Sequence, residues 1–304
     1  MRATALPAEV PVHPLIPVFE PWSIPLPFTI PIVNADSIHL FGIMVAIGFV
    51  TGSKIAMNKC ARDGLDPEII NKLVGYYVLA VFLGGHWGHL LFYYPEEIAK
   101  DPMVLLRFKS GLSSFGGFVA SLLLTIWFFF REQGQIRQEN RRLAKKGEPL
   151  KADLNIWPYA DSLLYGFTIG WMFGRIGCFS AHDHPGTPTN FWLGVPNMNP
   201  SIGCTREVAC HDLGLYEAIW SFVMYGVFRV LDKKPRFPGF FAGVWVLSYG
   251  SVRIVFDAFR HPNLDTRYFG LTPAQYGSML MIVGGIAIFM KRRHLSPVRT
   301  VQEA

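Results

Sequence analysis

The chain has 304 residues, of which 51% are hydrophobic, 14% aromatic and 16% charged; its net charge is +6 and its mean hydropathy +0.28. Soluble proteins average about 25% charged residues, so this composition excludes intrinsic disorder, a coiled coil and a disulfide-rich secreted scaffold, and it disfavours a cytosolic enzyme. Because the apolar residues occur in long blocks, we expect a single membrane domain.

The N-terminal segment, residues 1–37, is rich in proline and has no uninterrupted apolar centre. It lacks the basic start, apolar centre and small-residue cleavage site of a signal peptide. We therefore expect an external arm that lies on the membrane surface.

A helix needs about 20 mostly apolar residues to cross the hydrocarbon core. Seven stretches meet this length and predict an all-α membrane protein with seven spans: 38–58, 74–95, 113–131, 156–177, 214–231, 238–258 and 272–290. If the N-terminus is outside, 19 of the 28 lysines and arginines lie in, or at the ends of, the cytoplasmic segments, and seven lie outside. This positive-inside bias predicts a cytoplasmic C-terminus and explains the basic net charge without a nucleic-acid partner.

The longest external segment, 178–213, is predicted to be a head loop, and long ordered loops often carry function. It contains Cys204 and Cys210, whose short spacing allows a disulfide but does not require one. Cys178 with His182 and His184 has a spacing that zinc accepts, but further ligands are not evident, so we predict no metal and no cofactor. The cytoplasmic 131–155 segment is polar and basic, and we expect it to be partly helical and solvated.

Glycines recur at four-residue spacing in three predicted spans, a pattern that lets helix backbones approach closely. We expect helix packing, with access for a lipid chain as the alternative. The glycines concerned are Gly48, Gly52, Gly84, Gly88, Gly166, Gly170 and Gly174.

Ionisable side chains inside the spans cost free energy unless they are paired or hydrated. Arg253 and Asp257 are four residues apart and share a helix face. The others are Arg175, Glu217, His86 and His89, and all six fall in the outer halves of their predicted helices. Each has a structural alternative: an intrahelical ion pair, a favourable helix-dipole contact for Glu217, or packing for the histidines. Together they predict an outward polar cavity in which two arginines bind a phosphate-bearing ligand.

The order and spacing of eight short motifs resemble the prolipoprotein diacylglyceryl transferase family of bacterial inner membranes. The motifs are LFGIM at 40–44, FLGG at 82–85, LFY at 91–93, DPMVLLR at 101–107, LSSFGG at 112–117, GRIG at 174–177, LYE at 215–217 and YGSVRI at 249–254. The resemblance covers residues 38–293 and implies a seven-span transferase domain, preceded by the arm and followed by a cytoplasmic tail at 294–304.

The resemblance implies that the chain transfers the diacylglyceryl group of phosphatidylglycerol to the thiol of a cysteine in a prolipoprotein signal peptide. A thioether forms and glycerol phosphate leaves, on the periplasmic side. It also implies phospholipid binding by Arg175, Arg253, Gly186, Glu217, Gly116 and Gly117. Asp183 and Asp257, at positions where the family more often has glutamate, are predicted to be catalytic residues.

Three polar residues of the family are replaced in this chain. Its histidine before Gly116 is Phe115, its asparagine after the GRIG motif is Cys178, and a tyrosine in the first span is Phe41. Either another group takes the thiol proton, for which His182 and His89 are the first choices, or the fold serves another acceptor. A non-enzymatic lipid-binding or transport protein is the alternative class, disfavoured because no internal repeat is evident.

Overall fold

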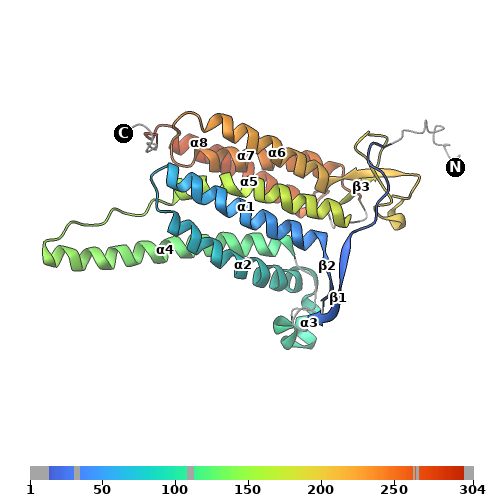
Figure 1. The fold of residues 1–304 in the computed structure, drawn as a ribbon, viewed down its shortest axis with the longest axis horizontal. Helices are drawn as coiled ribbons and strands as arrows, with labels where there is room; N and C mark the ends of the chain where they lie inside the picture. Colours follow the sequence, from blue (N-terminus) through green and yellow to red (C-terminus); the bar gives the residue numbers. More distant parts are fainter. Residues whose placement is uncertain (1–13, 31–34, 108–112, 263, 265–266, 298–304) are drawn as a thin grey trace.

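The computed structural model describes residues 14–30, 35–107, 113–262, 264 and 267–297. In these ranges the chain forms an elongated bundle of long helices, shown in Figure 1. The long helices are α1 (Leu40–Arg62), α2 (Pro67–Tyr93), α4 (Ser114–Lys146), α5 (Ile156–Ala181), α6 (Leu213–Leu231), α7 (Phe240–Ala258) and α8 (Pro273–Arg292). Each overlaps one of the seven predicted stretches.

The molecule is mostly helical and has the character of a membrane protein. Four helical segments among the described residues are long and apolar enough to cross a membrane: α1, residues 67–91 of α2, α7 and α8. The predicted stretches at 113–131, 156–177 and 214–231 are also helical, as α4, α5 and α6. That these three helices cross the membrane stays a prediction.

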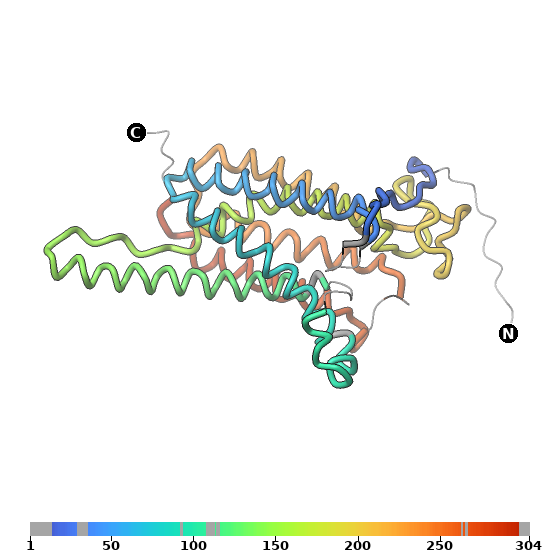
Figure 2. The backbone as a smooth tube through the Cα atoms, turned by 60° about the horizontal axis from the view of Figure 1, so that its bottom comes forward, coloured from blue at the N-terminus to red at the C-terminus, as the bar shows by residue number. Residues whose placement is uncertain are grey.

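Two helix boundaries differ from the hydropathy-based ranges. Helix α2 begins at Pro67 rather than at 74, because Asp66 accepts a hydrogen bond from the Glu68 amide and proline occupies the first turn. Helix α4 continues well past residue 131, to Lys146, and ends at Gly147 in the left-handed conformation. Its polar half extends beyond the bundle, as Figure 2 shows, so more of the 131–155 segment is helical than hydropathy indicates.

The glycines pack helices together. A Cβ added at Gly166 of α5 would lie 2.2 Å from the carbonyl oxygen of Gly52 in α1. A Cβ added at Gly116 of α4 would lie 2.2 Å from the carbonyl oxygen of Gly84 in α2. No side chain fits at either place, so these backbones are in direct contact. Close helix packing is therefore confirmed for both pairs, whereas Gly174 has open space beside it.

The expectation of an all-α fold is incomplete, because short strands cover one end of the bundle. Strands β1 (Ser23–Ile30) and β2 (Ala35–His39) pair antiparallel before α1. In the predicted head loop, β3 (Pro185–Pro188), β5 (Ala209–Asp212) and β4 (Val195–Pro196) form an antiparallel sheet in the order β3-β5-β4. A disulfide joins Cys204 to Cys210. These strands were not predicted because each has only two to eight residues and several contain proline.

The described part of the N-terminal arm contacts the segment between β3 and β4 and the start of α1. The Leu15 amide donates to the carbonyl oxygen of Trp192, 3.0 Å away, and the Leu40 amide donates to that of Trp22. Figures 1 and 2 both place the arm and the β3-β5-β4 sheet at the same end of the bundle. Two short helical turns, α3 (Pro95–Lys100) and η1 (Pro102–Leu106), follow α2 at this end, and η2 (Pro200–Ile202) lies within the loop.

The helices α5, α6 and α7 are joined by a buried aromatic cluster. Its buried members are Tyr165, Phe228, Phe241, Trp245 and Tyr249. Apolar burial at about 25 cal/mol per Å², together with edge-on ring contacts, holds these three helices in register. Tyr249 is the member closest to the strand-covered end, where its hydroxyl leaves the apolar cluster and meets charged groups.

Candidate active site

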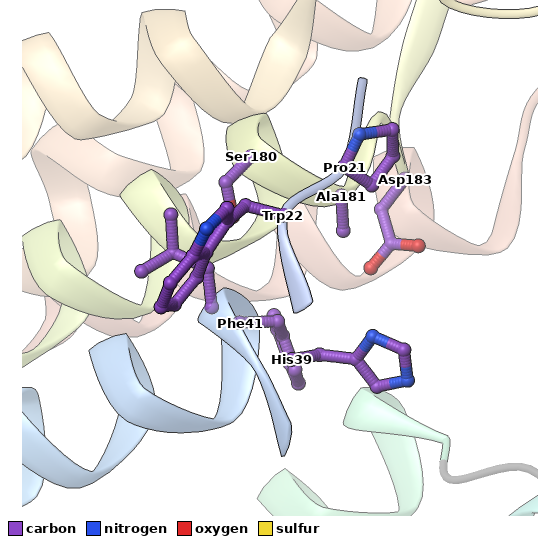
Figure 3. A pocket seen from close by; sticks show the side chains of 8 residues that line it. Pro21, Trp22, His39, Phe41, Ser180, Ala181 and Asp183 are labelled. Carbon is purple, nitrogen blue, oxygen red and sulfur yellow. The ribbon is translucent and has the colours of Figure 1, made fainter. Parts of the chain in front are cut away.

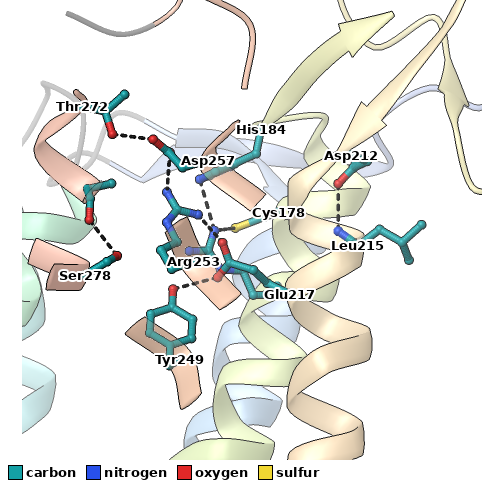
Figure 4. Close-up of polar contacts among 12 residues, drawn as sticks. Cys178, His184, Asp212, Leu215, Glu217, Tyr249, Arg253, Asp257, Thr272 and Ser278 are labelled. Atoms are coloured by element: carbon teal, nitrogen blue, oxygen red, sulfur yellow. Dashed lines mark hydrogen bonds and ion pairs between the residues drawn. The ribbon is translucent and has the colours of Figure 1, made fainter. Parts of the chain in front are cut away.

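One glutamate lies at the centre of the charged groups in Figure 4. Glu217 is fully buried in the first turns of α6, where the Asp212 carboxylate caps the helix by accepting from the Leu215 amide. Its carboxylate lies 2.9 Å from Nε of Arg175, forms a short ion pair with Nη1 of Arg253, and accepts a hydrogen bond of 2.8 Å from the Tyr249 hydroxyl. One buried anion therefore holds two cations from two other helices.

A second carboxylate supports Arg253. Asp257 lies one turn further along α7 and its Oδ1 is 3.6 Å from Nη2 of Arg253. Its Oδ2 accepts a short hydrogen bond from the Thr272 hydroxyl, and Thr272 forms a capping box with Gln275 at the start of α8. The orientation of Arg253 is thus fixed by α6, α7 and α8 together.

Arg175 has three further neighbours. Its Nη1 lies 3.1 Å from Nε2 of His184 and 3.8 Å from Sγ of Cys178. Its guanidinium carbon lies 4.3 Å from the ring centroid of Trp171, a cation–π distance. A planar cation held at two nitrogens and one face is well prepared for bidentate binding of a phosphate.

The loop after α5 brings Cys178, Asp183 and His184 close to Arg175. Their potential ligand atoms lie within 4.8 Å of one another, the separation that a bound metal ion requires. However, the cationic Nη1 of Arg175 already contacts two of the three, and this charge opposes a second cation. We therefore assign no metal to the cluster. Burial raises the pKa of the Asp183 carboxyl, and burial with the neighbouring arginines holds the pKa of His184 well below its usual value.

A cavity of about 180 Å³ opens beside this cluster, shown in Figure 3. It lies between the arm, the start of α1 and the end of α5. Its lining is mainly apolar, and the carboxylate of Asp183 and the imidazole of His39 supply its charged and titratable groups; the lining residues are Pro21, Trp22, His39, Leu40, Phe41, Ser180, Ala181 and Asp183. The cavity could receive a short, mainly apolar segment with one polar group near Asp183.

The structure brings together the predicted residues Arg175, Arg253, Glu217 and Asp257, and places Asp183 next to them. Gly186 packs against the end of α7, because a Cβ there would lie 2.6 Å from the carbonyl oxygen of Phe259. Three of the predicted groups sit elsewhere among packing contacts: Gly116 and Gly117 between α4 and α2, and His89 against the ring of Tyr94.

His182, the first predicted base, ends α5 in the left-handed conformation, and its Nε2 lies 3.1 Å from the carbonyl oxygen of Phe19. It contacts the arm in this structure. His86 similarly approaches the Val104 carbonyl oxygen, at 3.1 Å. Phe115 is the second residue of α4, and its side chain lies outside the described part of the structure.

Two members of the site were not singled out in the sequence. Tyr249 precedes Arg253 by four residues, so the spacing that pairs Arg253 with Asp257 also places Tyr249 on the same helix face. Thr272 precedes a proline at the start of the last span, a pattern typical of a helix cap. Both signals were present, but neither indicated a contact with Glu217 or Asp257 on another element.

Comparisons with known proteins show the family of this chain. The family model described as prolipoprotein diacylglyceryl transferase matches residues 27–291. A phosphatidylglycerol–prolipoprotein diacylglyceryl transferase of Chromohalobacter salexigens is 29% identical over 257 residues, which cover 83% of this chain and 86% of the relative. A relative with the same name from Pseudoalteromonas atlantica is 28% identical, over 84% of this chain and 85% of its own length. Another, from Solidesulfovibrio magneticus, is 29% identical, over 84% of this chain and 91% of its own length. The chain belongs to the prolipoprotein diacylglyceryl transferase family.

Proposed function

We propose that the chain transfers the diacylglyceryl group of phosphatidylglycerol to the thiol of a prolipoprotein cysteine, the first step of lipoprotein maturation. The observation that carries this proposal is the pair of arginines, Arg175 and Arg253, held together by the buried Glu217 at one end of an apolar helical bundle. The family match and the names of the relatives agree with it.

For the membrane, we propose seven spans, an external N-terminus and a cytoplasmic C-terminus. The domain boundaries are an arm at 1–37, a transferase domain at 38–293 and a tail at 294–304. This places the site toward the periplasm of a bacterial inner membrane. The distribution of lysine and arginine supports the orientation, and the four apolar helices support the multi-pass location.

In the proposed reaction, Arg175 and Arg253 bind the lipid phosphate, and Glu217 and Asp257 keep the two guanidinium groups in place. Gly186, Gly116 and Gly117 contribute to the proposed lipid site indirectly, by letting the backbones around it pack closely. Two cations in a site of low dielectric stabilise the negative charge that grows on the phosphate oxygen as the carbon–oxygen bond breaks.

The acceptor cysteine enters the cavity beside Asp183. Asp183 removes the thiol proton, and its raised pKa makes it a stronger base than an ordinary aspartate. The thiolate attacks the diacylglyceryl carbon bonded to the phosphate oxygen; the carbon–sulfur bond forms, and the electron pair of the broken bond leaves with glycerol phosphate. His182 and His89 stay as alternative bases, and each requires its present contact to rearrange.

The test uses the purified full-length protein, phosphatidylglycerol and a signal peptide that ends in a lipobox cysteine. Mass spectrometry measures the diacylglyceryl adduct on the peptide. We expect the adduct with the wild type and a loss of at least a hundredfold with Arg253→Gln, which keeps hydrogen bonding but removes the charge. Wild-type turnover that Arg253→Gln leaves near normal would exclude the phosphate-binding role, and lipid transport without turnover would favour the alternative class.

A further inference from the structure

His184 lies at a rigid junction of the proposed site. It directly precedes β3, and its carbonyl oxygen accepts a hydrogen bond from the Leu213 amide, 3.1 Å away, at the start of α6. The backbone at His184 is therefore fixed by the same helix that carries Glu217. Nε2 of its imidazole lies 3.1 Å from Nη1 of Arg175, and Figure 4 shows the His184 side chain next to Cys178.

The hydrogen-bond partner, Arg175, determines which tautomer the His184 imidazole adopts. An arginine guanidinium only donates hydrogen bonds, so Nε2 of His184 has to accept, and the proton of a neutral ring lies on Nδ1. The charged groups around the ring agree, because Arg175, Arg253 and Arg260 all oppose a further positive charge there. Nδ1 is buried and has no hydrogen-bond partner among the described residues, so this nitrogen has one N–H available for an anion.

Cys178 approaches the same arginine nitrogen from the end of α5, with its Sγ 3.8 Å from Nη1. A thiol is a weak acceptor, and at this distance it contributes little. The resemblance to the family implies asparagine at this position, and an amide oxygen is a stronger acceptor than a thiol. In this chain the acceptor for Nη1 comes instead from the loop.

We propose that His184 is a positioning residue, and that its neutral imidazole holds Arg175 for the lipid phosphate in place of the asparagine that Cys178 replaces. This inference rests on the proposed function. Glu217 holds Nε, His184 holds Nη1 and Trp171 covers one face, so Arg175 meets an incoming phosphate already oriented. Without the histidine acceptor, Arg175 loses one of these constraints, and binding of phosphatidylglycerol weakens more than the chemical step.

Three variants of the full-length protein test this inference. His184→Leu removes the acceptor, whereas His184→Gln keeps an amide oxygen near the place of Nε2. The double variant Cys178→Asn with His184→Leu restores an acceptor from the other side. We expect His184→Leu to raise KM for phosphatidylglycerol about tenfold and to change kcat less than threefold, and we expect the other two to return KM to within about threefold of the wild type.

Direct binding separates this inference from the proposed function. Each variant is incorporated into nanodiscs with a fixed fraction of phosphatidylglycerol, and lipid affinity is measured without an acceptor peptide. Weaker binding by His184→Leu, recovered in the double variant, supports the positioning role even if no transfer is detected. A wild-type affinity in His184→Leu, or an equal loss in all three variants, contradicts it, because a purely structural defect would not be reversed by Asn at position 178.

Discussion

Replacing Glu217 by glutamine tests the charge arrangement that the site depends on. The substitution keeps the size of the side chain and its ability to accept from Tyr249, but it removes the negative charge between Arg175 and Arg253. The two arginine side chains are only 7% and 11% exposed, so water cannot replace the lost counter-charge. Removing one partner of a buried ion pair typically costs about 3–5 kcal/mol.

This loss is a large part of the roughly 5–15 kcal/mol that stabilises a typical folded protein. At about 2–4 °C per kcal/mol for a chain of this size class, Glu217→Gln should melt at least about 6 °C below the wild type in lipid-free detergent. Tyr249→Phe is the matched control, since it removes one neutral donor to the same carboxylate and should cost about 0.5–1.5 kcal/mol.

The same variant has a second consequence. Two arginines without a counter-charge form a stronger binding site for an anion, so phosphatidylglycerol should raise the melting temperature of Glu217→Gln more than that of the wild type, and phosphatidylcholine should not. Differential scanning fluorimetry with each lipid measures both effects. If Glu217→Gln melts with the wild type and gains nothing extra from phosphatidylglycerol, Glu217 does not hold the two arginines as described.

Three further predictions concern other parts of the molecule. Gly116→Ala should lower the melting temperature strongly, since its Cβ would lie 2.2 Å from a backbone oxygen of α2. Gly117→Ala should not, because the nearest atom to its Cβ would be 3.5 Å away. Equal melting temperatures of the two variants would contradict this packing. Because burial raises the pKa of Asp183, the transfer rate should fall during acidification at a higher pH than it would with an aspartate of ordinary pKa. Asp183→Asn should lose activity at all pH values. A variant with the wild-type rate and pH profile would exclude Asp183 as the base. Breaking the Cys204–Cys210 disulfide, which joins residues six apart, should cost about 2 kcal/mol from the entropy of a loop of this length, and an unchanged melting temperature in reductant would refute it.

The sequence predicted the features whose free-energy cost depends on one residue or on its near neighbours along the chain. Apolar length alone located the seven long helices, and the cost of burying charge singled out Arg175, Glu217, Arg253 and Asp257. The four-residue glycine spacing correctly indicated close helix packing. In each case the sequence signal lies in the residue itself or in a residue one helical turn away.

The sequence was less informative where the partner comes from a distant element. The spacing of Arg253 and Asp257 predicted their pairing, but the contact of Arg253 with Glu217 crosses from α7 to α6 and has no signature along the chain. The sequence places His182 and His184 two residues apart and does not distinguish their contacts. Only the fold shows that His184 reaches Arg175, whereas His182 contacts the arm. The short strands of the loop lie below the length at which alternation is recognisable.

Counting both products of one reaction tests whether this protein transfers the diacylglyceryl group. Purified protein is incubated with phosphatidylglycerol and the lipobox peptide, and mass spectrometry quantifies the peptide thioether while an enzymatic assay quantifies the glycerol phosphate released. We expect equal amounts of the two products, and neither product with a peptide in which serine replaces the cysteine. Folded protein that binds phosphatidylglycerol but yields no thioether, or that releases glycerol phosphate equally with the serine peptide, would contradict it.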